Sequence, residues 1–344
     1  MPPTFITGAM TVDKILLAHG SGGKLARELI QNSFLTAFHN PVLNQLNDSA
    51  IMEPGGRIAF TTDSYVVQPI FFPGGDIGKL AVCGTVNDLA MVGAKPRYLS
   101  LAFIIEEGLL LSDLEKIVRS VRDAAEATGV DVVTGDTKVV NRGNADKLFI
   151  SSSGIGVVPE GVNISGHNAC PGDAVILSGY IGDHGIAVLS QREGFAFDTE
   201  LVSDCAPLNE LVAGMIGVSN NIHCLRDPTR GGLASVLNEI AEQSGVGIRI
   251  NEASVPVRSE VLSVCEMLGL DPLYVANEGK LVAIVAPENA EMILDWMRKN
   301  RYGEDAAIIG EVNVEHPGRV VMRTRFGTSR IIDMLVGEPL PRIC

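Results

Sequence analysis

Apolar strands alternate with amphipathic helices in both halves of the chain, and this alternation restricts the fold more than any other feature. In the first half, strands are expected at 57–61 and 99–105, with a helix over 77–93 between them. In the second half, the strand 174–177 and a helix around 233–240 repeat the pattern. A sheet and a helix each bury one apolar face, so alternation of this kind favours layered α/β domains. The class expected is α/β (α+β).

The stretch 161–172 is rich in Gly, Pro, Asn and His and has little apolar periodicity, so we expect the domain boundary there. A length of 344 residues also favours two domains. The predicted organisation, set out in order, is a mobile leader over 1–15, an N-terminal domain over 16–160, a C-terminal domain over 161–333 and a flexible tail over 334–344.

The tail ends on Cys344, and the alternating prolines Pro339 and Pro341 keep it extended. Eleven residues at roughly 3.3 Å each span about 35 Å, enough to carry the thiol from a surface strand into a distant cleft. A frayed end with an incidental cysteine is the ordinary alternative. The interpretation as a reactive arm is favoured because the body of the chain carries carboxylates suited to phosphate chemistry and no other obvious nucleophile.

Charge and cysteine usage exclude several classes of protein. The net charge of −14 argues against nucleic acid and anionic membranes as partners, since both need a basic surface. The six cysteines form no C-x-x-C pair, so neither a disulfide framework nor a structural zinc site is predicted. The sequence shows no signal peptide and no apolar run long enough for a membrane span. A cytoplasmic protein is expected.

Three acids of the first half lie beside small or hydroxylated residues. Asp63 follows a predicted strand, Asp88 lies on the apolar side of the 77–93 helix, and Asp136 follows the short strand 130–133. Carboxylates that gather at one place repel one another unless a cation lies among them, and Mg²⁺ prefers oxygen ligands. A magnesium-nucleotide site is one interpretation. Three separate turn residues, or a buried cap or ion pair at Asp88, are the alternatives.

Glycine-rich segments supply candidate phosphate contacts. Gly20, Gly22, Gly23 and Lys24 precede a predicted helix over 25–38, although the spacing is not that of a P-loop and a flexible linker is an equal alternative. A second such segment, which starts with Arg226 and Asp227, opens a helix in the other half. The histidines His19 and His184 have glycine neighbours and are expected to be turn residues.

Local motifs resemble, in this order, the ATP-binding motifs of the aminoimidazole ribonucleotide synthetase superfamily, whose fold is called PurM-like. The matching segments are Thr62-Asp63-Ser64, Asn87-Asp88-Leu89-Ala90 and Gly135-Asp136-Thr137-Lys138. Within this superfamily the chain resembles the carbamoyl dehydratases of [NiFe] hydrogenase maturation. That likeness rests on the loop 19–23 and on the segments 71–75, 226–232 and 277–280, and above all on the end Pro341-Arg342-Ile343-Cys344.

The resemblance implies a homodimer whose N-terminal domains pair their sheets into a β-barrel, with ATP near the interface. It implies that HypF places a carbamoyl group on Cys344, that ATP drives its dehydration to a thiocyanate, and that the HypC and HypD complex receives the cyanide on iron. Expected metal ligands are Asp63, Asp88, Asp136 and Asp227, and expected catalytic residues are Cys344, Glu278 and Lys138. The expected ATP contacts are Gly20, Gly22, Gly23, Lys24, Asn87, Thr137 and Lys138.

Two other functions remain open on the sequence alone. One is a small-molecule ATP-using synthetase or kinase of the same superfamily, which would have no use for a terminal thiol. The other is a non-enzymatic carrier whose tail holds cargo and whose nucleotide only controls docking of the tail.

Overall fold

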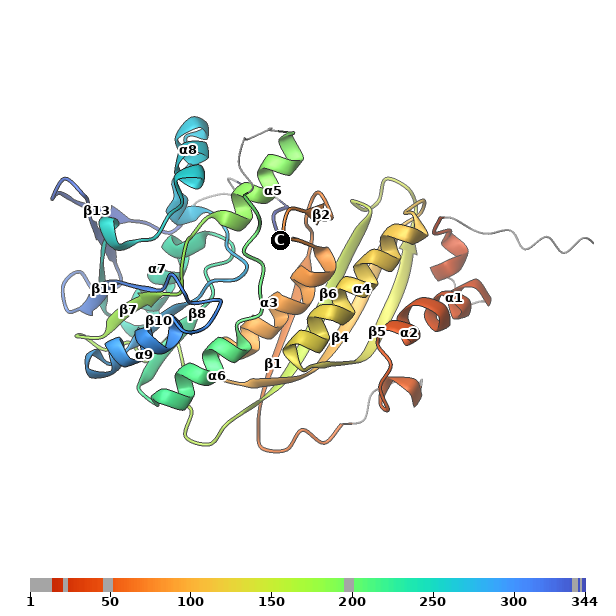
Figure 1. Ribbon diagram of the computed structural model, residues 1–344, viewed down its shortest axis with the longest axis horizontal. Helices are drawn as coiled ribbons and strands as arrows, with labels where there is room; N and C mark the ends of the chain where they lie inside the picture. The colour runs from red at the N-terminus through yellow and green to blue at the C-terminus, as the bar shows by residue number, and fades with distance from the viewer. Residues whose placement is uncertain (1–13, 21–23, 46–51, 195–200, 336–339, 341) are drawn as a thin grey trace, which may run out of the picture.

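Two β-sheets, each with helices packed against it, organise the chain (Figure 1). This computed structural model describes residues 14–20, 24–45, 52–194, 201–335, 340 and 342–344. Within those residues, no helix combines the length and the apolar character that crossing a bilayer requires.

The N-terminal sheet has four strands in the order β1-β6-β4-β5. Their bounds are β1 Arg57–Tyr65, β6 Leu148–Val158, β4 Lys95–Glu106 and β5 Asp131–Val140. Only the β4–β5 pair is parallel. The helices α3 (Ile77–Met91) and α4 (Leu111–Thr128) cover one face of this sheet, and the hairpin of β2 (Phe71–Phe72) and β3 (Gly75–Asp76) leads into α3. The strands β1 and β5 are the two edges.

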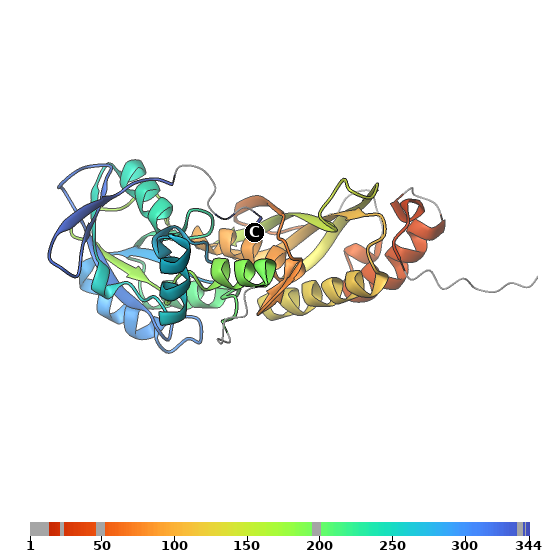
Figure 2. The same ribbon diagram turned by 90° about the horizontal axis from the view of Figure 1, so that it is seen from above.

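Short helices lie beyond the β5 edge, at the far end of the molecule from the second domain (Figures 1 and 2). They are η1 (Leu17–Gly20), α1 (Lys24–Leu29), the π-helical turn η2 (Ile30–Phe34), α2 (Leu35–Ala37) and η3 (Leu43–Gln45). One continuous helix over 25–38 was predicted, and the π-turn divides it. Ile15, which was predicted to belong to the leader, is buried and exchanges backbone hydrogen bonds with Gly108 and Leu109.

The C-terminal sheet has seven strands in the order β13-β12-β9-β11-β7-β10-β8. Their bounds are β13 Ser329–Ile332, β12 Val320–Arg323, β9 Gly247–Asn251, β11 Ala307–Asn313, β7 Ala174–Leu177, β10 Val282–Val285 and β8 Ile222–Arg226. The surrounding helices are α5 (Asp183–Glu193), α6 (Asn209–Val218), α7 (Gly232–Ser244), α8 (Ser259–Leu268) and α9 (Ala290–Met297). Short 3₁₀ turns η4 (Glu252–Ser254), η5 (Pro272–Tyr274) and η6 (Pro287–Asn289) connect them.

Strand alternation explains why the centre of this sheet is buried on both faces. Along β7, Val175 and Leu177 pack against α7, whereas Ile176 packs with α6 and α9 on the other side. The second of these clusters also contains Leu89 and Met91 from the end of α3, so it joins the two sheets. Helix α3 is therefore buried on nearly all sides and carries the junction between the domains.

Candidate active site

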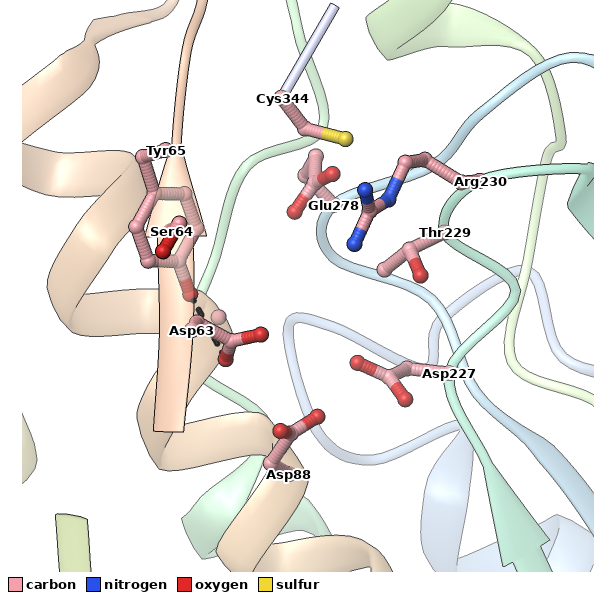
Figure 3. A pocket seen from close by; sticks show the side chains of 10 residues that line it. Asp63, Ser64, Tyr65, Asp88, Asp227, Thr229, Arg230, Glu278 and Cys344 are labelled. Carbon is pink, nitrogen blue, oxygen red and sulfur yellow. Dashed lines mark hydrogen bonds between the residues drawn. The ribbon is translucent and has the colours of Figure 1, made fainter. Parts of the chain in front are cut away.

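A pocket lies where the end of β1, the middle of α3 and two loops of the C-terminal half meet (Figure 3). It is lined by Asp63, Ser64, Tyr65, Gly84, Asp88, Asp227, Thr229, Arg230, Glu278 and Cys344. Five of these are residues that the sequence singled out, and they come from segments far apart along the chain. The fold thus brings Asp63, Asp88, Asp227, Glu278 and Cys344 to one place, while their chemical roles stay predictions.

The N-terminal side of the pocket depends on the alternation of side chains between the two faces of β1 and on a glycine of α3. Asp63 and Tyr65 lie on the same face of β1, which is longer than predicted and continues to Tyr65. Tyr65 donates a hydrogen bond to Asp63 Oδ2 at 3.2 Å. A Cβ at Gly84 would lie 2.3 Å from the Tyr65 hydroxyl oxygen, so only glycine leaves room for this ring. One turn later, Asp88 accepts a hydrogen bond from Thr61 Oγ1 at 2.7 Å.

The C-terminal side is built from the loop after β8 and the loop before β10. Asn277 fixes both, because its side chain donates to Pro228 O at 2.8 Å and accepts from Gly182 N at 2.7 Å. Glu278 follows, with its backbone N–H held by Asp204 Oδ1 at 3.0 Å. Asp204 in turn lies 3.5 Å from the Lys280 amine. Asp227 faces Asp63 and Asp88 across the pocket, and Arg230 lies beside Glu278 (Figure 3).

The acids of the pocket oppose one another's ionisation. Burial, with Asp227 and Asp63 nearby, raises the pKa of Asp88 to about 7. Burial is also the main cause that raises the pKa of Asp227 to about 6. Burial first, and then Asp227 and Asp204, hold the pKa of Glu278 well above its ordinary value. Converging carboxylates whose ionisation is disfavoured in this way are a suitable site for a divalent cation, which would relieve the repulsion.

The end of the tail lies inside this pocket. The Cys344 side chain lies beside Glu278 (Figure 3), and burial together with that carboxylate raises the pKa of the thiol well above its ordinary value. Arg342 exchanges hydrogen bonds with Gln68 at 3.0 and 2.9 Å and forms an ion pair with Asp146 at 2.8 Å. Much of the predicted flexible segment, residues 336–339 and 341, lies outside the described residues.

His184 contacts the tail directly, which the sequence did not predict. It is fully buried on α5, its Nε2 lies 2.9 Å from Ile343 O, and its Nδ1 lies 2.7 Å from Ser203 Oγ. Ile343 itself is buried. By contrast, His19 only caps its own turn, accepting from Leu16 N at 2.9 Å. His184 is therefore a docking residue for the tail, whereas His19 is the local turn residue that was expected.

The prediction that Asp136 and Lys138 join the other acids is wrong within one chain. The strand expected to stop at residue 133 continues to Val140 as β5, the sheet edge opposite β1. Asp136 pairs with Ala102, and its side chain lies on the exposed face of the sheet. Asp63 pairs with Ser152, which in turn pairs with Leu101, and these side chains lie on the opposite face, which α3 covers. Three strand spacings of about 4.8 Å, and the sheet itself, separate them. Thr137 is on the covered face of the same distant edge.

The predicted ATP contacts are also divided. Asn87 is buried and its amide is used within the chain, donating to Ala206 O at 3.0 Å and accepting from Leu208 N at 2.8 Å, so it joins the domains instead of facing the pocket. Gly20 ends η1 and Lys24 begins α1, both beyond the β5 edge. Gly22 and Gly23 lie outside the described residues.

Tyr65, Thr61 and Arg230 are pocket or supporting residues that were not proposed for the site. Arg230 belongs to the segment 226–232 that was noted for its glycines, and it supplies a cation to the pocket. Tyr65 could have been found from its position two residues after Asp63 on a strand. The pocket as a whole offers carboxylates that could hold a metal, a guanidinium that could bind an anion, the buried Glu278 carboxyl group and a thiol.

Comparisons with known proteins agree with this arrangement. The family models for the N-terminal and C-terminal domains of AIR synthase related proteins match residues 46–158 and 170–323. A carbamoyl dehydratase HypE from Cupriavidus necator is 55% identical over 96% of this chain and 95% of its own length. A crystal structure of a hydrogenase maturation protein HypE in complex with ATP superposes with a TM-score of 0.93 at 52% identity, covering 96% of this chain and 99% of that one.

A HypE chain from a crystal structure of a HypE–HypF complex is also similar, with 53% identity, a TM-score of 0.79 and coverage of 89% of this chain and 99% of that chain. These similarities extend over nearly the whole chain and include both domains. The chain therefore belongs to the HypE family of carbamoyl dehydratases, hydrogenase maturation proteins with the PurM-like fold of the AIR synthase related proteins.

Proposed function

We propose that this chain uses ATP to dehydrate a carbamoyl group carried on the sulfur of its own Cys344, giving a thiocyanate. The observation that carries the proposal is the position of the terminal thiol, which lies among Glu278, Arg230 and the pocket acids of the same chain (Figure 3). A small-molecule enzyme would have no reason to fill its own pocket with its last residue. The relative whose crystal structure contains ATP supports ATP as the co-substrate.

The proposed reaction has two steps. First, the carbamoyl oxygen attacks the γ-phosphate of ATP, so that an O–P bond forms, ADP leaves and the nitrogen gives up one proton. Second, the C–O bond breaks, phosphate leaves and the second nitrogen proton is lost as the C≡N bond forms. Glu278 is the proposed base, because it adjoins the sulfur and because a raised pKa makes an ionised carboxylate a better proton acceptor.

Mg²⁺ fits the acids that the structure brings together. Asp63, Asp88 and Asp227 are the residues that would hold it, since they converge in the pocket and the Asp63 carboxylate disfavours the ionisation of the other two. The ion would supply charge neutralisation for the triphosphate. Arg230 provides a further positive charge from the chain itself, opposite Asp63 (Figure 3).

A role for Asp136, Lys138 and the segment 20–24 requires a second copy of the chain. Asp136, Lys138, Gly20 and Lys24 lie at or beyond the β5 edge, away from the pocket of their own chain. The uncovered face of the sheet carries apolar side chains, with Phe60 68% and Ile58 51% exposed. Burying this face against a second sheet is favourable, and the edge strands β1 and β5 are the places where a second sheet can join. We therefore propose the homodimer with a shared β-barrel.

The proposed partners follow from the reaction. A relative crystallised with HypF supports HypF as the enzyme that loads Cys344. The HypC and HypD complex is the proposed acceptor of the cyanide on iron, in the cytoplasm. No nucleic-acid or membrane partner is proposed for a chain of this charge.

Mass analysis of the C-terminal peptide tests the function. Protein loaded with carbamoyl by HypF and then given Mg-ATP is expected to lose the mass of one water from the peptide that contains Cys344. Glu278→Gln should bind ATP yet keep the carbamoyl mass, whereas Glu266→Gln, an exposed glutamate of α8, should convert normally. Full conversion by Glu278→Gln would remove this residue from the role of base. A wild-type carbamoyl mass that never converts would favour the carrier, and ATP turnover that persists after deletion of Cys344 would favour a small-molecule enzyme.

A further inference from the structure

A second group of chemically active side chains lies in the C-terminal domain and takes no part in the proposed reaction. Cys170 and Asp173 belong to the turn before β7, and His223 lies on the edge strand β8. One ligand atom from each, the thiol sulfur, a carboxylate oxygen and a ring nitrogen, lie within 4.8 Å of one another. Ligand atoms this close together can contact a single metal ion.

The turn that carries two of these ligands is fixed by the sheet. Gly172 N donates to Val312 O at 2.8 Å, and Val312 N donates to Asp173 O at 2.8 Å. The buried Asp173 carboxylate accepts from Cys170 N at 2.7 Å and lies 2.7 Å from His223 Nδ1. The carboxylate thus already orients the other two residues toward itself. Ligands held on rigid elements in this way lose little freedom on binding an ion.

The donor set identifies the class of ion. A thiolate, an imidazole and a carboxylate suit Zn²⁺ and its neighbours Co²⁺ and Ni²⁺, whereas Mg²⁺ and Ca²⁺ prefer oxygen ligands throughout. Cys170 is exposed and the His223 side chain is 29% exposed, so water or an outside ligand can reach the group. The adjacent Cys224 is fully buried in the core and is not available as a ligand.

We propose that Cys170, Asp173 and His223 form a binding site for a divalent transition metal of the Zn²⁺ class, with three protein ligands and a fourth position open to solvent. The ion binds Nδ1 of His223 in place of its hydrogen bond to Asp173, the neutral imidazole carries its one proton on Nε2, and Cys170 binds as its thiolate. Metal binding therefore releases the thiol proton, and the affinity of the site for the ion rises with pH. Because His223 lies 50 residues after Asp173 and the site has no C-x-x-C spacing, no sequence motif indicates it.

Cobalt provides the test, because a thiolate bound to Co²⁺ gives a charge-transfer absorption band and oxygen ligands alone do not. Co²⁺ is titrated into the metal-free, full-length protein under a phosphine reductant, for the wild type and for Cys170→Ser, His223→Gln and Cys344→Ser. Of the six cysteines, Cys170 and Cys344 are the two that are not buried. The Cys344→Ser variant therefore shows whether the tail thiol is the source of the band.

The expected result is a band that saturates at one ion per chain, persists in Cys344→Ser and is removed by Zn²⁺. Cys170→Ser should abolish it, and His223→Gln should weaken Co²⁺ binding by about 10-fold or more. A wild-type protein without the band would show that Asp173 and His223 form only a hydrogen-bonded turn. A band that survives in Cys170→Ser, or that is lost in Cys344→Ser alone, would also overturn the proposal. Circular dichroism of Cys170→Ser confirms that an exposed substitution has not unfolded the chain.

Discussion

Replacing Asp88 with Asn should stabilise the metal-free protein and weaken its response to Mg²⁺. Asp88 is mostly buried, and its pKa lies at about 7 instead of 3.8 because burial, Asp227 and Asp63 disfavour its charge. Asn keeps the acceptor for the Thr61 hydroxyl, which now bonds Asp88 Oδ2 at 2.7 Å. The substitution therefore removes the buried charge while preserving the hydrogen bond.

The sign and size of the effect follow from linkage. A carboxyl whose folded pKa is raised contributes stability that is present below its unfolded pKa, near 4, and is lost as pH rises through about 7. A difference of about 3 pKa units, at ~1.4 kcal/mol each, gives an upper limit of ~4 kcal/mol. Because the repulsion is shared among several acids, we expect Asp88→Asn to recover about half of this limit, ~2 kcal/mol. That gain in the free energy of unfolding corresponds to a rise in Tm of roughly 5 °C for a domain of this size.

Thermal unfolding in EDTA, at about pH 5 and about pH 8, measures the effect. The gap in Tm between Asp88→Asn and the wild type should widen toward high pH, and saturating Mg²⁺ should raise the Tm of the wild type more than that of the variant. Asp295→Asn is the matched control, because Asp295 is an exposed residue of α9 that does not line the pocket, and it should change neither result. An Asp88→Asn protein that is less stable than the wild type without metal, or equally responsive to Mg²⁺, would refute the repulsion on which the metal site rests.

Three further substitutions test the pocket and the tail. His184→Phe removes the hydrogen bond to Ile343. Cys344 should then react with maleimide about 5-fold faster, given ~1 kcal/mol per bond, and an unchanged rate would mean that the bond does not hold the tail. Gly84→Ala places a Cβ against Tyr65, so it should reduce the free energy of unfolding by ~1–3 kcal/mol and weaken Mg-ATP binding. Denaturant unfolding that is the same as in the wild type would contradict that packing. Asn87→Ala should destabilise the chain by ~1–3 kcal/mol, because it leaves Leu208 N and Ala206 O unpaired, while calorimetry should find ATP affinity of the folded protein unchanged. A selective loss of ATP affinity would instead restore Asn87 to the nucleotide site.

The fold class was predictable because the apolar period changes from strand to helix repeatedly in both halves, and local patterns carry that information. The convergence of Asp63 and Asp88 was anticipated from the residues beside them, and the addition of Glu278 to the site of Cys344 came from the resemblance to a known family. Asp136 shows the limit of such reasoning. Whether β5 stops at 133 or continues to Val140 decides which face its side chains occupy, and pairing with β4 settles this.

Features that depend on tertiary contacts could not be predicted from the sequence. Asn87 looks like a ligand residue beside Asp88, yet the loop 206–208 uses its amide. His184 lies next to glycines, as a turn residue would, and only the docked tail shows what it binds. Cys170 belongs to no C-x-x-C pair and so carries no metal motif, although it is exposed beside His223. In each case a partner far away in the sequence decides the role.

Tracing the carbamoyl oxygen tests the central claim most directly. If the carbamoyl oxygen on Cys344 attacks the γ-phosphate, a heavy oxygen isotope placed in that carbonyl must appear in the inorganic phosphate released with ADP. Mass spectrometry of the phosphate and of the C-terminal peptide in a single turnover gives the answer. The account predicts one labelled oxygen per phosphate for each thiocyanate formed. Unlabelled phosphate, with the label lost to water or retained on the tail, would contradict it.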